Sequence, residues 1–321
     1  MSRKHIKTLL SMLLLASLLL QGGCTAMKSI KEDSIHEDLP QIDPEAGLSR
    51  DITATLYYRL ENEPYLVGVR HSVAVRSDET PETAIVQTLL TGVPLLSENV
   101  ENVFPAGTEA VNVARDGSIL YITLSEEFMD NDPTLQDEEL YVRRRMGLYA
   151  IVNSVTAYEP DVRVMVSVMR QGAAGRLRYA ELGMQGAGTS LGFLEPMSFE
   201  EKAVVTPENI LDCVLRHMID GQPAFAYDLF AETESGEGQK PPYEAFVAAF
   251  NEGETVAAYA LNGYTILRNT AYATVDADIT LVDEAGNIRT IENAQVRLKR
   301  EGDLYLVEYY AFQKKLGRGV Q

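Results

Sequence analysis

The chain has 321 residues and a formal net charge of −19, with 47 acidic against 28 basic side chains. This length is enough for two domains, each of which can bury a core of its own. The acidic balance excludes nucleic acid as a partner, because binding to phosphates needs basic side chains, and it opposes electrostatic adhesion to anionic lipid.

The first 24 residues have the pattern of a lipoprotein export signal. Three basic side chains precede an apolar run over residues 9–20, which is too short to span a bilayer and ends in Gly22-Gly23-Cys24. We expect a signal peptide at 1–23, cleavage before Cys24 and acylation of that cysteine. The chain is then held on the extracytoplasmic face of the cell membrane by lipid. An ordinary cleaved signal or an uncleaved anchor is the alternative, because Gln21 takes the place of the usual leucine.

A tether is expected to follow the anchor. Residues 24–51 are polar, contain two prolines and show no hydrophobic period, which is typical of a flexible linker. With Cys24 acylated, Cys213 has no partner for an internal disulfide. Its place in an apolar helical pattern predicts a buried thiol.

Residues 52–203 are predicted to form an α+β domain. Thr80-Pro81 supplies a helix cap followed by proline at the first helical position, and Asp116-Gly117 is a strong hairpin signal. In chain order, we expect strands at 53–58 and 65–75, a helix at 81–91, strands at 109–114 and 119–124, a helix at 138–158 and a strand at 162–169. This order predicts helices packed on one face of a small mixed sheet.

Residues 204–316 are predicted to form a second α+β domain, in which helices come first and a curved antiparallel sheet follows. Alternation of apolar and polar side chains is clearest from Tyr272 to Leu281. The expected elements are helices at 207–220, 224–231 and 243–251, followed by strands at 259–268, 271–282, 288–299 and 304–312. Such an order suggests a cone-shaped fold.

The first domain resembles a known family. The segments that carry the likeness are PETAIVQTLLTGVP, NVFPAGTEAVNV, LYITLSEEFMD and GLYAIVNSVTAYEPDVRVMVSV. Residues 52–196 resemble the GerM domain of sporulation and spore-germination proteins, which is similar in fold to the ring-building motifs of secretion-type assemblies. The resemblance implies a lipoprotein or membrane-anchored protein that is not an enzyme. It also implies a place in complexes between mother cell and forespore. Only one copy is found, so self-assembly through paired domains is not expected.

The second domain resembles, less specifically, the nuclear-transport-factor-2-like superfamily. The likeness rests on element order and on the strand pattern ATVDADI. That fold hosts both enzymes and non-catalytic adaptors, so it does not indicate a function by itself. Asp276 and Asp278 lie about 7 Å apart on one face of the predicted strand and are candidates for lining a pocket. The alternative is that this face is simply exposed to solvent.

Other catalytic and metal-binding patterns are weak. Residues 188–192 match G-x-S-x-G, but no strand and helix frame them and no histidine base can be assigned. The histidines and cysteines have no ligand spacing. The acidic residues Asp130, Asp132, Asp137 and Glu138 lack the order of a calcium-binding loop. We therefore predict no catalytic residue, no metal and no cofactor.

Three consecutive cations stand out in this acidic chain. Arg143, Arg144 and Arg145 cover about 200° of a helix, so they cannot all face the core. Glu139 can pair with Arg143 one turn away. These arginines are either a solvated face or a contact surface for an acidic neighbouring subunit.

The sequence favours a non-catalytic, lipid-anchored protein that acts by protein–protein contact in spore formation or germination. The alternative is an extracytoplasmic lipoprotein that binds a small ligand, or acts as a catalyst or regulator, through its C-terminal domain. A regulator of non-sporulating bacteria is a third possibility. The oligomeric state is left open, and an oligomer is compatible with the sequence.

Overall fold

The computed structural model describes the chain from residue 49 onward, apart from a few short segments. The described residues are 49–93, 99–184, 192–232, 239–251 and 253–317. The expected signal, Cys24 and nearly all of the tether lie outside them. From Arg50 onward the chain forms one compact unit. No helix among the described residues is long and apolar enough to cross a membrane.

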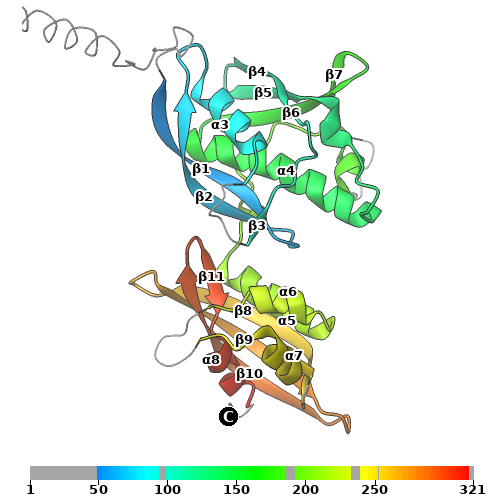
Figure 1. The fold of residues 1–321 in the computed structure, drawn as a ribbon, viewed down its shortest axis with the longest axis vertical. Helices are drawn as coiled ribbons and strands as arrows, with labels where there is room; N and C mark the ends of the chain where they lie inside the picture. Colours follow the sequence, from blue (N-terminus) through cyan, green and yellow to red (C-terminus); the bar gives the residue numbers. More distant parts are fainter. Residues whose placement is uncertain (1–48, 94–98, 185–191, 233–238, 252, 318–321) are drawn as a thin grey trace, which may run out of the picture. The chain divides into compact units, whose positions relative to one another are not determined.

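Two sheets form the first part of this unit (Figure 1). One is antiparallel, with the order β2-β1-β3, and consists of β1 (Arg50–Leu60), β2 (Leu66–Val75) and β3 (Val100–Glu101). The other has the order β4-β5-β6-β7 and is mixed, because β5 and β6 run parallel. Its strands are β4 (Ala110–Asp116), β5 (Ile119–Leu124), β6 (Arg163–Arg170) and β7 (Ala173–Arg176). The helices are α3 (Pro81–Leu90) and α4 (Asp137–Tyr158), with short 3-10 turns η1 (Glu126–Met129), η2 (Tyr179–Leu182) and η3 (Glu201–Ala203).

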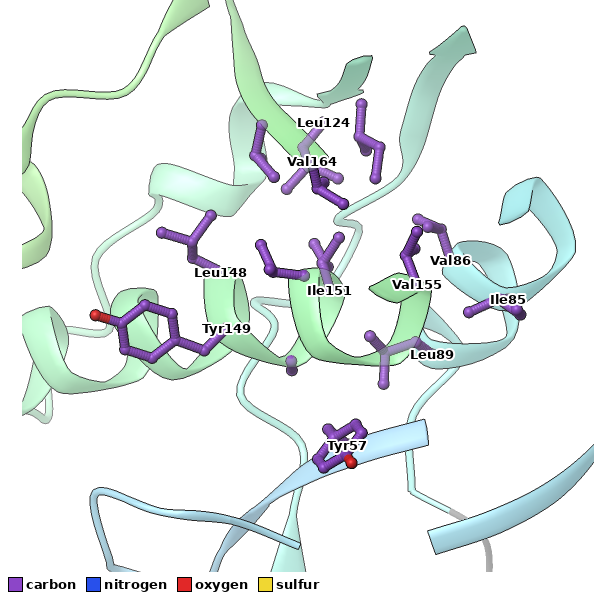
Figure 2. Packing of buried hydrophobic residues seen from close by; sticks show 14 of the residues in the cluster. Tyr57, Ile85, Val86, Leu89, Leu124, Leu148, Tyr149, Ile151, Val155 and Val164 are labelled. Atoms are coloured by element: carbon purple, nitrogen blue, oxygen red, sulfur yellow. The ribbon is translucent and has the colours of Figure 1, made fainter. Parts of the chain in front are cut away.

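Helix α4 is the centre of this part. It contacts β1 of the first sheet, β6 of the second sheet and α3. Every residue from Met146 to Thr156 is buried. Figure 2 shows Ile151 turned toward Leu124 and Val164, while Tyr57 of β1 lies on the other side of the helix. A helix segment that is buried all round must be covered on several sides, and the two sheets and α3 supply that cover.

The α+β class predicted from the sequence is confirmed. The mixed sheet that the element order predicted is the sheet of β4 to β7. The separate sheet of β1, β2 and β3 was not predicted. Periodicity shows which face of a strand is buried, but it does not show which strands pair.

The second part consists of helices followed by an antiparallel sheet that curls into a half-barrel (Figure 1). The helices are α5 (Pro207–Ile219), α6 (Pro223–Asp228), α7 (Tyr243–Asn251) and α8 (Tyr309–Lys315). The strands, in the order β11-β10-β9-β8, are β8 (Thr255–Ile266), β9 (Tyr272–Val282), β10 (Ile288–Glu301) and β11 (Leu304–Val307). The apolar residues of β9 that the alternation placed inside are fully buried, namely Ala273, Val275, Ala277, Ile279 and Leu281.

The strand predicted at 304–312 is wrong in its second half. Strand β11 ends at Val307, and α8 begins two residues later. Tyr309 and Phe312 lie three residues apart on this helix and both pack against the ring of Phe230. The run of aromatic residues has high strand propensity, but burial of this aromatic cluster favours the helix.

Candidate functional site

Arg143 belongs to a network of four charged side chains on three elements. Its Nε donates to Glu139 Oε1 at 3.2 Å, and its Nη2 donates to Glu101 Oε2 of β3 at 3.0 Å. The predicted pair of Glu139 and Arg143 is thus confirmed. Arg59 of β1 is 1% exposed, binds the same two carboxylates, and donates from Nε to the carbonyl of Glu63 at 2.6 Å.

The network balances two cations against two carboxylates. Burial by itself would raise the pKa of Glu139, but the hydrogen bonds and charges of Arg59 and Arg143 outweigh it and hold that pKa below its usual value. The guanidinium of Arg143 is therefore paired with carboxylates of its own chain. It ties the end of β3 to α4.

The other two arginines of the run fasten two further segments. Arg144 donates from Nη2 to the carbonyl of Met129 and to Asn131 Oδ1, both at 2.6 Å. Arg145 donates from Nη1 to the carbonyl of Leu182 at 3.3 Å. All three arginines are half-buried. Because each of them is hydrogen-bonded within the chain, the three arginines do not form a freely solvated face. Their role as a contact surface stays a prediction.

Arg143 and Arg144 line a cavity of about 290 Å³, which we call the α4 cavity. Its lining comes from the stretch before β4, the stretch after η1 and the first turns of α4. The lining residues are Val103, Phe104, Pro105, Ala106, Phe128, Asp130, Asn131, Asp132, Leu135, Leu140, Arg143 and Arg144. The cavity thus has an apolar floor and polar groups around it.

The floor of the α4 cavity depends on a glycine. Phe104 and Phe128 are buried, and their ring centroids lie 6.4 Å apart. A Cβ atom on Gly147 of α4 would stand 3.2 Å from both rings. Glycine in a helix interior is destabilising by about 1 kcal/mol relative to alanine, and here it lets two aromatic rings pack against the helix backbone.

The rim of the α4 cavity is acidic. Asp130 is exposed and makes no hydrogen bond or ion pair through its side chain with any described residue. Asp132 accepts from the backbone N–H of Thr134 at 2.9 Å and from its hydroxyl, and these bonds lower the pKa of Asp132. Asp137 and Glu138, in the first turn of α4, are exposed but do not line the cavity.

The second pair of candidates lies elsewhere, on the outer face of β9. Asp278 accepts from the backbone N–H of Asn293 at 2.7 Å and from Asn262 Nδ2 at 3.2 Å, and these bonds hold its pKa below the usual value. Both partners lie at register shifts, one in β10 and one in β8. Asp278 therefore pins two bulges of the sheet. Asp276 is half-buried, and a pocket beside the pair stays a prediction.

A buried polar cluster around Glu63 was not predicted from the sequence. This residue follows β1, is 1% exposed, and pairs with Arg216 and His217 of α5. Nδ1 of His217 lies 2.9 Å from Oε1 of Gln222. Arg216 and His217 are more than 150 positions from Glu63 in the sequence, so no local spacing could reveal the cluster. In the described part of the chain, no group of three or more histidine, cysteine, aspartate or glutamate side chains is placed to hold a metal ion. Most of the G-x-S-x-G pattern at 188–192 lies outside the described residues.

The stretch that contains the α4 cavity also has known relatives. Residues 55–169 match the family model described as "Germane: Sporulation and spore germination". This match relates the first part of the chain to proteins of sporulation and spore germination. No curated protein matches the sequence.

Three solved structures are similar to parts of the chain. The tandem GerMN domains of the sporulation protein GerM from Bacillus subtilis are 19% identical, with a TM-score of 0.32, over 53% of this chain and 51% of that one. A putative lipoprotein from Clostridium perfringens is 20% identical, with a TM-score of 0.24, over 38% of this chain and 76% of that one. The first GerMN domain of the Bacillus subtilis protein is 16% identical, with a TM-score of 0.25, over 46% and 96%. The chain thus spans about half the length of the tandem structure. The likeness of residues 204–316 to the nuclear-transport-factor-2-like superfamily stays a prediction.

Proposed function

We propose that this chain is a lipid-anchored, non-catalytic protein of spore formation or germination that acts by contact with other proteins on the extracytoplasmic face of the membrane. The observation that carries the proposal is the family match over residues 55–169. The export signal that ends at Cys24 supports the anchor. The proposal includes two domains, at 52–203 and 204–316; the buried apolar residues form two clusters, of which the second also takes in Leu60 and Val67 of the first domain. The second domain then serves as another contact or as a spacer.

The α4 cavity supports a contact role. It lies within the matched stretch, and hydrogen bonds from Arg144 hold the end of η1 and the lining residue Asn131 in place. A preformed apolar hollow with a polar rim is the usual receptor for an anchor side chain of a partner protein. Such a hollow needs little ordering when the partner binds.

The test is the heat-resistant spore titre of a strain that lacks the gene, complemented with the wild-type chain, with Cys24→Ala or with Cys213→Ala. We expect the titre to fall by several orders of magnitude, and to be restored by wild type and by Cys213→Ala but not by Cys24→Ala. Cys213→Ala controls for loss of a thiol elsewhere, and immunoblots of each strain control for protein level. An unchanged titre in the deletion strain would remove the sporulation role. Full rescue by Cys24→Ala would remove the lipid anchor.

A further inference from the structure

We propose that the α4 cavity binds one bulky apolar side chain of a partner protein, and that this side chain is flanked by lysine or arginine residues. The inference rests on the proposed function of protein contact and names the chemistry of the partner. It concerns the acidic rim and the apolar floor of the cavity together.

The size of the cavity suits a single side chain. Its volume of about 290 Å³ lies at the lower limit of pockets that enclose a drug-sized ligand, for which roughly 300–1,000 Å³ is usual. Five of its lining residues are large apolar ones, namely Val103, Phe104, Phe128, Leu135 and Leu140. A leucine, isoleucine, methionine or phenylalanine side chain of a partner would contact these residues and cover the apolar surface that they leave open to water. Anchors of this kind dominate the affinity of protein interfaces.

The charges around the cavity select what flanks that anchor. Arg143 is neutralised by Glu101 and Glu139, which it shares with Arg59. Among the arginines of the lining, this leaves Arg144, whose Nη2 is held against a carbonyl and an amide oxygen. Against this one cation stand two exposed carboxylates of the lining, those of Asp130 and Asp132. The excess of negative charge favours a partner segment with basic residues beside its apolar anchor and disfavours an acidic one.

The cavity is also fixed before binding. Arg143 holds the end of β3, two residues before the lining begins at Val103, and Arg144 holds the end of η1 and the lining residue Asn131. Gly147 lets the two aromatic rings of the floor pack close to the helix backbone. Association therefore costs conformational entropy mainly in the partner segment. A short peptide can represent that segment in a binding experiment.

The experiment measures fluorescence anisotropy of a labelled peptide with the full-length chain in detergent micelles. The probe carries one leucine between two Lys-Lys pairs. In one control peptide serine replaces the leucine, and in another glutamates replace the lysines. We expect the probe to bind, both controls to bind at least 10-fold more weakly, and the affinity for the probe to fall as salt rises. If the serine peptide bound as tightly as the probe, the proposed apolar anchor would be overturned. If the glutamate peptide bound as tightly as the probe, the proposed selection for basic residues would be overturned.

Two variants of the chain test the location. Ala106 is exposed and lines the cavity, so Ala106→Trp should fill the cavity and weaken binding of the probe at least 10-fold. Asp130→Lys should weaken binding about 3-fold to 10-fold and reduce its salt dependence. Ala174→Trp on β7 and Asp161→Lys in the turn before β6 are the matched controls at exposed positions and should leave binding unchanged. Equal binding by Ala106→Trp and Ala174→Trp would place the contact outside the cavity.

The spore titre of the same variants separates this inference from the proposed function. A low titre for Ala106→Trp together with a normal titre for Ala174→Trp would support both. If Ala106→Trp lost the probe but kept a normal titre while the deletion strain did not sporulate, the cavity would be overturned as the contact and the sporulation role would stand. If the deletion strain sporulated normally while Ala106→Trp still lost the probe, the binding site would be supported and the sporulation role would fall.

Discussion

Arg59→Met removes the most deeply buried cation of the charged network. The guanidinium of Arg59 is 1% exposed and holds two carboxylates and one backbone carbonyl, so its loss leaves one cation, Arg143, against Glu101 and Glu139. Removing one partner of a buried pair is destabilising by about 3–5 kcal/mol. The side chains of Glu101 and Glu139 are 19% and 34% exposed, so water compensates part of the loss. We expect a decrease in the free energy of unfolding of about 3 kcal/mol, which is about 6–12 °C in melting temperature.

Arg143→Met is the matched control, because this arginine binds the same two carboxylates from a position that is 30% exposed. Pairs open to solvent contribute about 0–1 kcal/mol, so this variant should lose much less stability than Arg59→Met. Both are measured by thermal and urea unfolding at pH 7 and again at acid pH. Because Arg59 lowers the pKa of Glu139, the gap between wild type and Arg59→Met should narrow as the pH falls through that lowered pKa. Equal losses in the two variants, or a loss below about 1 kcal/mol for Arg59→Met, would refute the reasoning.

Three further predictions concern Glu63, a pair of glycines and Cys213. The pKa of Glu63 is lowered below its ordinary 4.5, because a hydrogen bond from the α5 histidine and the charge of the α5 arginine outweigh burial. The contribution of Glu63 to stability is therefore complete above pH 4.5 and is lost as the pH falls through the lowered pKa. Glu63→Gln should lower the free energy of unfolding by about 3 kcal/mol at pH 7 and should make it depend less on pH in the acid range. An unchanged pH dependence in this variant would contradict the reasoning. Gly183 has a φ of +64°, and a Cβ there would stand 2.7 Å from Cβ of Tyr141, whereas Gly286 has a φ of +81° and open space around it. Both alanine variants should lose about 1–2 kcal/mol through backbone strain, and Gly183→Ala should lose clearly more in urea unfolding because of the collision; equal losses would rule the collision out. Burial raises the pKa of the Cys213 thiol, so iodoacetamide should not modify it in the native protein. Mass spectrometry should find the peptide that contains Cys213 unmodified before unfolding and modified after it. Rapid labelling of the native protein would show instead that the helix opens.

Local chemistry made several elements predictable. Thr80 accepts a hydrogen bond from the backbone N–H of Thr83, and Pro81 begins α3, as the cap pattern indicated. The turn at Gly117 has a φ of +59°, which fits the hairpin predicted between β4 and β5. Each of these features depends on residues that are close together in the sequence.

The candidate site was predictable only in part. The arginine run was identified, and so was the bond between Glu139 and Arg143, because both depend on helical spacing. The bonds from Arg144 to the stretch after η1 and the cavity that this stretch encloses were not predicted. They depend on how segments 13 to 15 positions apart turn back on each other. The sequence pattern of a loop does not specify that path.

The sequence by itself determined the acidic character of the chain and the faces of strands such as β9, whereas the export signal at 1–23 stays a prediction. These follow from composition and from the period of two or 3.6 residues, which the backbone geometry imposes on every strand and helix. Only the tertiary structure decided that β1, β2 and β3 form a separate sheet, that the end of the chain forms α8, and that Arg59 is buried. Arg59 and Glu139 are 80 positions apart. Their pairing depends on burial and charge balance in the folded core, which no local pattern records.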